Sequence, residues 1–80
     1  MRIDKYLKVT RIIKRRTVAN EAADGGRISV NGKAVKASYT VKIGDIIEVG
    51  FGSKTLKIRV TDIKETVQKD NAATLYEVIS

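Results

Sequence analysis

Cationic side chains recur at intervals of three or four residues near the N-terminus. They are Arg2, Lys5, Lys8, Arg11 and Arg15. In a helix and its flanks, this spacing places the side chains on one side. Like charges so spaced repel by a few tenths of a kcal/mol per pair, and no acidic residue is interleaved on that side of the expected helix. We therefore expect a polyanion to supply the counter-charge, although a solvated polar face is the alternative that most charge runs represent.

A second cationic feature is the run Lys14-Arg15-Arg16, which precedes a segment with helical spacing. The free N–H groups at the start of a helix and its positive dipole end favour an anion. The run therefore predicts a phosphate contact at this helix start. The RNA-binding residues that we predict from the two features together are Arg2, Lys5, Lys8, Arg11, Lys14, Arg15 and Arg16.

The net charge of +7 is distributed unevenly along the 80 residues. Residues 1–36 hold ten Lys and Arg and three Asp and Glu, whereas residues 37–80 hold six of each sign. The whole excess therefore lies in the first half, where it can produce a directional field that attracts a nucleic acid.

Three further cations, Arg27, Lys33 and Lys36, fall on or near an expected hairpin. They are possible peripheral RNA contacts. Charges on a short edge strand can equally serve to discourage aggregation, and both interpretations stay open. We expect Asp4 to cap a helix and brace the neighbouring cations, and Thr17 to be an N-cap.

Residue types that carry catalysis or bind metal are scarce. The chain has no cysteine and no histidine, which excludes thiolate sites and the commonest metal ligand and general base. The acidic pairs Glu21/Asp24, Asp45/Glu48 and Asp62/Glu65 are scattered, and we interpret all six as solvated surface. We therefore predict no catalytic residues, no metal, no cofactor and no enzymatic activity.

The aromatic residues limit the mode of recognition. Proteins that bind single strands stack bases on exposed aromatic side chains. This chain has only Tyr6, Tyr39, Phe51 and Tyr76, which are scattered, and Tyr6 falls among expected core positions. The sequence therefore favours recognition of a folded RNA by its shape and phosphates over reading of its bases.

Two helices are predicted to position these cations. Apolar residues at helical spacing predict a first helix over residues 4–13. A second helix begins after Thr17, carries Val18, Ala19, Ala22 and Ala23 on one side, and ends at Asp24-Gly25-Gly26, where glycine supplies a left-handed residue.

The rest of the chain has the period-two pattern of strands. Residues 27–30 and 33–35 flank Asn31-Gly32, which predicts a two-residue hairpin turn. Residues 47–51 and 56–60 alternate on either side of Gly52-Ser53, residues 64–71 are expected to be loop, and residues 74–79 form a last strand. The predicted fold class is α+β, with a two-helix basic motif packed on a curved antiparallel sheet of about five strands.

The length and the apolar runs limit the organisation of the chain. Eighty residues suit one domain, with the helical motif and hairpin in about 1–50 and the completion of the sheet in about 51–80. The apolar runs are far too short to cross a bilayer, and no signal region is visible at the N-terminus. We therefore expect no membrane partner and a cytoplasmic location.

Four segments resemble a known family, the S4-type RNA-binding domain. They are residues 2–7, residues 10–11, residues 15–19 and residues 26–32 with their Val-Asn-Gly turn. The resemblance covers residues 1 to about 50. Two mild departures are Thr10, where serine is common, and Ile43, where proline often precedes Gly44-Asp45. The resemblance implies this family's two-helix RNA-binding motif, with the seven predicted cations as its RNA-facing positions.

Among free-standing members, the chain is similar to those of bacterial ribosome-associated quality control, which are related to heat-shock protein fifteen. This likeness implies a ribosome-associated protein that contacts 23S rRNA and peptidyl-tRNA on an obstructed large (50S) subunit. It also implies a quality-control tailing factor as a partner, whose extension of the nascent chain the protein supports. Separately, we expect the protein to be a monomer. The alternatives are an adaptor for a protein partner and a targeting module for an RNA-modifying enzyme.

Overall fold

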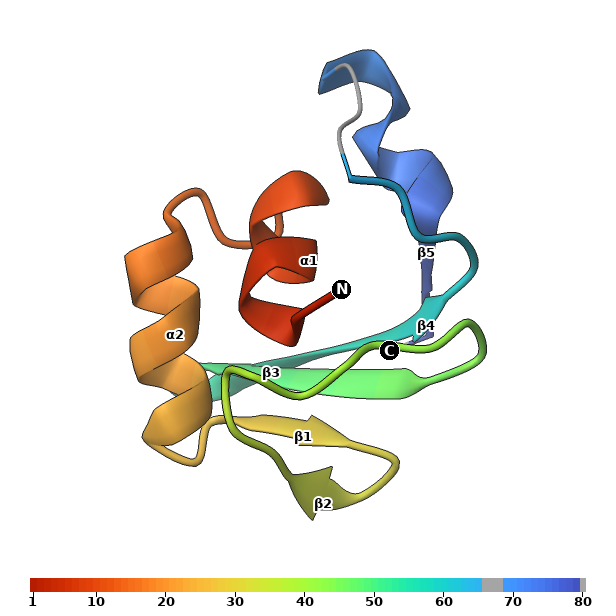
Figure 1. The fold of residues 1–80 in the computed structure, drawn as a ribbon. Helices are drawn as coiled ribbons and strands as arrows, with labels where there is room; N and C mark the ends of the chain where they lie inside the picture. The colour runs from red at the N-terminus through yellow and green to blue at the C-terminus, as the bar shows by residue number, and fades with distance from the viewer. Residues whose placement is uncertain (66–68, 80) are drawn as a thin grey trace.

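The computed structural model describes residues 1–65 and 69–79 and confirms the α+β prediction (Figure 1). Two helices precede a five-stranded antiparallel sheet with the strand order β2-β1-β3-β4-β5. Both helices pack against the same face of the sheet (Figure 1). The elements are α1 (Ile3–Val9), α2 (Arg16–Asp24), β1 (Ile28–Val30), β2 (Lys33–Ala34), β3 (Ile46–Phe51), β4 (Lys54–Val60), η1 (Lys69–Leu75) and β5 (Tyr76–Val78).

Helix α1 is shorter than predicted, because the helix ends at Val9 rather than at residue 13. The hydroxyl of Thr10 donates to the carbonyls of Tyr6 (2.9 Å) and Leu7 (3.2 Å) in the last turn of the helix. Arg11 then takes a left-handed conformation with φ of 63°, which stops the helix. Ile13 still reaches the core, since the connection folds back and its amide donates to the carbonyl of Leu7.

Helix α2 begins two residues earlier than predicted, at Arg16. Arg15 is in the N-cap position and no side chain caps the helix, so the prediction of Thr17 as N-cap is wrong. The predicted helix end is confirmed, because Gly26 has φ of +81° after the last turn. Small side chains let the helix approach the sheet, and Ala19, Ala22 and Ala23 are buried against it.

Both predicted hairpins are confirmed. Strands β1 and β2 pair through Ser29 with Ala34 and Val30 with Lys33, across a turn in which Asn31 and Gly32 both have positive φ. Strands β3 and β4 pair from Ile46 with Arg59 to Phe51 with Lys54. Strand β1 also pairs with β3, so the two hairpins join into one sheet.

The C-terminal part differs from the prediction in one element. Residues 64–71 were expected to be loop, but Lys69–Leu75 forms the 3-10 helix η1, and residues 66–68 of that prediction lie outside the described residues. The last strand is confirmed as β5, which pairs with β4. Leu75 is fully buried, whereas Val78 is 60% exposed.

The core lies between the helices and one face of the sheet. Alternate residues of β1, β3 and β4 are buried there, including Ile28, Ile47 and Ile58, and they face Ile3 and Leu7 of α1. Burying each such side chain contributes about 1.5–3 kcal/mol. The helices that carry the cations are therefore held on a rigid support.

Among the described residues, no helix has both the length and the apolar character that crossing a bilayer requires.

Candidate nucleic-acid interface

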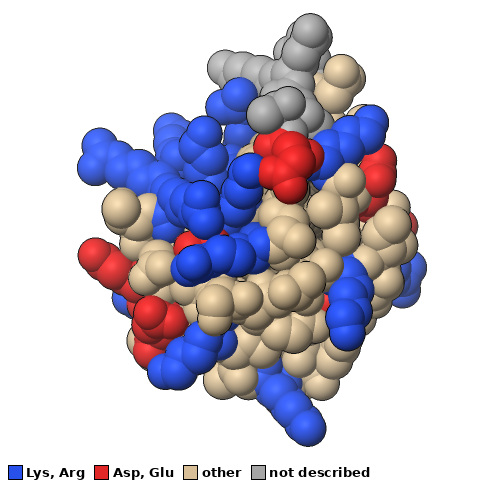
Figure 2. Space-filling view, in the orientation of Figure 1, with Lys and Arg blue, Asp and Glu red and all other residues tan. Residues whose placement is uncertain are grey.

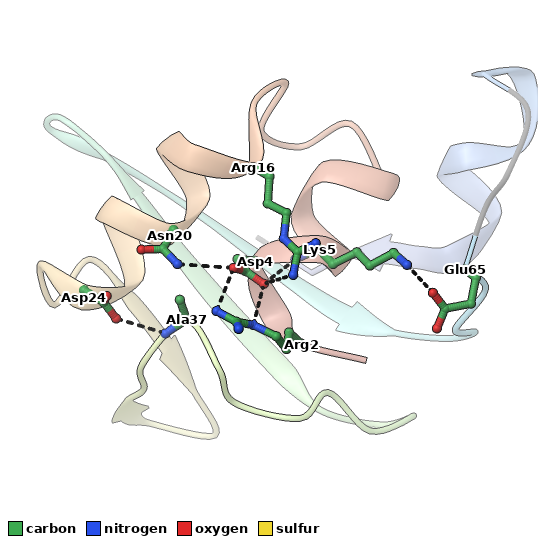
Figure 3. A network of polar contacts seen from close by, with 8 residues as sticks. All are labelled: Arg2, Asp4, Lys5, Arg16, Asn20, Asp24, Ala37 and Glu65. Atoms are coloured by element: carbon green, nitrogen blue, oxygen red, sulfur yellow. Dashed lines mark hydrogen bonds and ion pairs between the residues drawn. The ribbon is translucent and has the colours of Figure 1, made fainter.

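The start of α1 and the first turns of α2 meet around one buried carboxylate (Figure 3). Asp4 is 2% exposed, and it accepts two hydrogen bonds from the Arg2 guanidinium at 3.2 and 3.1 Å. The Arg16 guanidinium donates at 3.4 Å, the Asn20 amide at 3.3 Å and the backbone N–H of Lys5 at 2.8 Å. The predicted role of Asp4 as a brace for neighbouring cations is confirmed, but it does not cap α1, whose N-cap is Arg2.

The ionised form of Asp4 is stabilised by this network. Burial by itself raises the pKa of Asp4, but the hydrogen bonds from Asn20, Arg16 and the Lys5 amide outweigh it, and the pKa lies below 3.8. The carboxylate is therefore charged at neutral pH and orients the two guanidinium groups. Each guanidinium has five N–H donors, so both keep donors free for a further anion.

The guanidinium groups remain accessible despite this anchoring. The side chains of Arg2 and Arg16 are 48% and 47% exposed. They line a cleft of about 430 Å³ between the two helices, together with Asp4, Thr17, Asn20 and Glu21. The two planar guanidinium groups are held in fixed orientations beside the cleft, a geometry suited to hydrogen bonding with phosphate oxygens.

Lys5 points away from Asp4 toward the segment after β4, where it forms an ion pair with Glu65 (Figure 3). The hydrogen bond from Lys5 lowers the pKa of Glu65 below its ordinary value. The expectation that no acidic residue relieves the cationic side is therefore wrong in two places. Asp4 lies beneath it, and Glu65 reaches it from the second half of the chain, which spacing within a helix does not reveal.

The remaining four predicted cations have no such partner. Among the described residues, Lys8, Arg11, Lys14 and Arg15 are exposed and form no ion pair. Figure 2 shows Lys and Arg side chains gathered over α1, the start of α2 and the connection between them. We call this set of seven the cationic surface, and its members are Arg2, Lys5, Lys8, Arg11, Lys14, Arg15 and Arg16.

The three peripheral cations lie apart from one another. Arg27 is near Lys14, since both line one groove. Lys33 lies on the edge strand β2, at the lower end of the molecule in Figure 1, whereas α1 is in the upper half. Lys36 lines a small hollow beside Asp24. The structure thus brings Arg27 to the cationic surface but not Lys33.

In the part of the chain that is described, no three acidic residues come together as potential ligands of a metal ion. The interpretation of all six acids as solvated surface is wrong for Asp45, which is 6% exposed. Asp45 accepts hydrogen bonds from the Tyr39 hydroxyl (2.8 Å), the Lys42 amide (2.9 Å) and the Asn31 side chain (3.2 Å). It fixes the loop after β2 to the β1–β2 turn.

Two residues at the interface were missed from the sequence. Asn20 lies four residues after Arg16 and so shares its face of α2, a spacing that could have indicated a shared partner. Glu65 gave no comparable signal, because its contact with Lys5 spans 60 positions in the chain.

Comparison with known proteins finds a matching family and similar chains. Residues 1–47 match the model of the S4 domain family. The chain is 55% identical over 80 residues to a Streptococcus pneumoniae protein named "RQC P-site tRNA stabilizing factor", covering all of this chain and 91% of that protein. It is 52% identical over 79 residues to a Bacillus subtilis protein of the same name, covering 99% and 92% of the two.

A solved structure supports the fold assignment. The trimeric structure of heat shock protein 15 from Vibrio cholerae matches with a TM-score of 0.92 at 30% sequence identity. The match covers 100% of this chain and 82% of that one. The two proteins thus share the two-helix motif and the five-stranded sheet.

Proposed function

We propose, from the premise that the chain belongs to the S4 domain family together with the RQC P-site tRNA stabilizing factors, that it is an RNA-binding protein of ribosome-associated quality control. It acts on the large ribosomal subunit, where it contacts tRNA in the P site. The name of the relatives supports the tRNA contact, and the S4 domain supports RNA as the ligand.

The single observation that carries this proposal is the cationic surface. Its seven members come from residues 2–16, and four of them have no acidic partner among the described residues. Phosphate contacts from such a surface supply most of the affinity for nucleic acid and fix its orientation. Arg2 and Arg16 are pre-oriented by Asp4 and would grip phosphates most specifically.

Contact with two RNAs at once explains how a small protein could stabilise a bound tRNA. We infer that the cationic surface faces 23S rRNA and the tRNA together and so bridges them. A tRNA held in this way on an obstructed subunit would support extension of the nascent chain by a tailing factor on the same subunit. On this account the protein is a monomer that works by binding and catalyses no reaction.

Co-sedimentation with purified large subunits carrying peptidyl-tRNA tests this proposal. The double variant Lys8→Glu, Arg15→Glu reverses two cations that have no acidic partner among the described residues, and it should remove the protein from the subunit fraction. The control Lys33→Glu, Lys57→Glu makes the same charge change on β2 and β4, away from the cationic surface, and should leave co-sedimentation intact. Folding of both is checked by circular dichroism.

The opposite outcome would contradict the proposed function. A folded Lys8→Glu, Arg15→Glu variant that still sediments with large subunits contradicts binding through the cationic surface. If binding to the subunit also survives nuclease digestion of accessible RNA, the protein is instead an adaptor that binds a protein partner.

A further inference from the structure

An apolar groove lies between α2 and the end of the β3–β4 hairpin, where β3 and β4 approach α2 in Figure 1. Its volume is about 470 Å³, within the range of roughly 300–1,000 Å³ found for small-ligand sites. Ile12, Val18 and Phe51 contribute apolar surface to it. Val18 and Phe51 are 47% and 45% exposed, so two exposed large apolar side chains share one hollow.

Phe51 differs from the other aromatic residues in its exposure. Tyr6 is fully buried and donates its hydroxyl proton to the carbonyl of Leu75, while Tyr39 and Tyr76 are half-buried against the core. Phe51 lies two positions beyond the buried Val49 on β3, so its ring lies on the core side of the sheet. Phe51 lies beyond the buried residues of β3, so part of its ring is accessible to a ligand.

Cationic side chains flank the groove. Lys14 lines it from the connection between the helices and is also a member of the cationic surface. Arg27 lines it from the start of β1, and its carbonyl accepts a hydrogen bond from the amide of Gly50 (2.9 Å), beside Phe51. Among the described residues neither cation is in an ion pair, and Glu21 is the one acid that lines the groove.

We infer that this groove receives an unpaired base of the bound RNA, which stacks on the ring of Phe51 while Lys14 and Arg27 hold the flanking phosphates. An aromatic face with cations beside it is the combination by which proteins bind unstacked bases. An apolar side chain from a protein partner would use Val18 and Phe51 but would leave both cations without counter-charge. This inference rests on the proposed RNA binding and adds a base contact to it.

The groove adjoins the cationic surface, so one RNA strand can contact both. Because Lys14 belongs to both, an RNA strand that lies on the cationic surface can extend over Lys14 into the groove. A stacking site of this kind is tolerant of base identity, since every base has an aromatic face.

Fluorescence of the variant Phe51→Trp tests the inference directly. The natural chain has no tryptophan, so the emission reports position 51 alone. Protein-free 23S rRNA and deacylated tRNA are titrated in separate arms, with binding followed in parallel by gel shift. Quenching that accompanies binding to one of the two RNAs is expected, and it identifies which RNA supplies the base. Binding to both RNAs without any change of emission overturns the inference.

Affinity measurements on Phe51→Ala and Phe51→Leu complete the test. Loss of one base stack should weaken RNA binding on the order of 5- to 100-fold for both variants, while Phe51→Trp retains it. The control Val78→Ala removes an exposed apolar side chain on β5 and should change nothing. Full affinity of Phe51→Leu would contradict ring stacking and favour an apolar protein partner. Absence of RNA binding by the natural chain would instead contradict the proposed function.

Discussion

At the scale of the residue, the carboxylate of Asp4 is buried, yet it faces two guanidinium groups that are half exposed. Its substitution separates two accounts of the interface. If charge alone mattered, Asp4→Asn would strengthen RNA binding, because the net charge rises by one. If the orientation of Arg2 and Arg16 matters, binding weakens although the charge rises.

We expect Asp4→Asn to lower affinity for large subunits by on the order of tenfold and the free energy of unfolding by about 1–3 kcal/mol. Affinity is measured by co-sedimentation and stability by urea unfolding. Glu21→Gln, which lines the same cleft without bracing a cation, is the matched control and should bind at least as well as the natural chain. Stronger binding by Asp4→Asn would argue against pre-orientation.

The lowered pKa of Asp4 also predicts a dependence of stability on pH. A carboxyl whose folded-state pKa lies below its ordinary 3.8 contributes stability that is complete above that value and is lost as pH falls through the folded-state pKa. Urea unfolding between pH 5 and pH 2 should therefore show a falling free energy, and the fall should be smaller in Asp4→Asn. Equal slopes for the two proteins would contradict the network at Asp4.

Arg11 is held in a left-handed conformation, with φ of 63°, that glycine adopts without strain. A cation at this strained backbone position indicates that Arg11 serves RNA binding at a cost in folding stability. We expect Arg11→Gly to raise the free energy of unfolding by about 1 kcal/mol while weakening RNA binding and lowering its salt slope by about one. Arg11→Ala should weaken binding without the gain in stability. A glycine variant with unchanged RNA affinity would show that Arg11 contacts no phosphate.

At the scale of the elements, Asp45 joins the loop after β2 to the β1–β2 turn through Tyr39, Lys42 and Asn31. Burial and the hydrogen bond to Asp45 raise the pKa of Tyr39. Asp45→Asn loses acceptor capacity in a buried place and should cost about 1–3 kcal/mol in urea unfolding. Glu48→Gln, which affects a half-exposed pair with Lys57, should cost less than about 1 kcal/mol. Similar losses for both would show that Asp45 is not a buried anchor.

The order and type of the main elements could be predicted from local patterns, and their ends less well. Asn31-Gly32 fixes its hairpin because both residues accept positive φ at little cost. The end of α1 was placed four residues late, because the apolar spacing continues to Ile13 although Arg11 breaks the helix. The helix η1 was missed, since its polar residues have no clear period.

At the scale of the whole molecule, the uneven distribution of charge along the sequence becomes a cluster of Lys and Arg side chains over the two helices on the face that Figure 2 shows. Sequence spacing could predict the members of the cationic surface, because they are near neighbours in the chain. It could not predict the contact of Lys5 with Glu65 or the groove at Phe51. Both form only when residues 49–65 return to the helices through the sheet.

The dependence of RNA binding on salt tests the central claim most directly. The dissociation constant for large subunits is measured from 50 to 300 mM KCl for the natural chain and for the variant Lys8→Ala, Arg11→Ala, Lys14→Ala, Arg15→Ala. A slope of about +4 to +6 in log Kd against log[KCl] is expected for the natural chain, and it should fall by about three to four in the variant. A slope that is near zero in the natural chain, or equal in the two proteins, would contradict binding of RNA phosphates by the cationic surface.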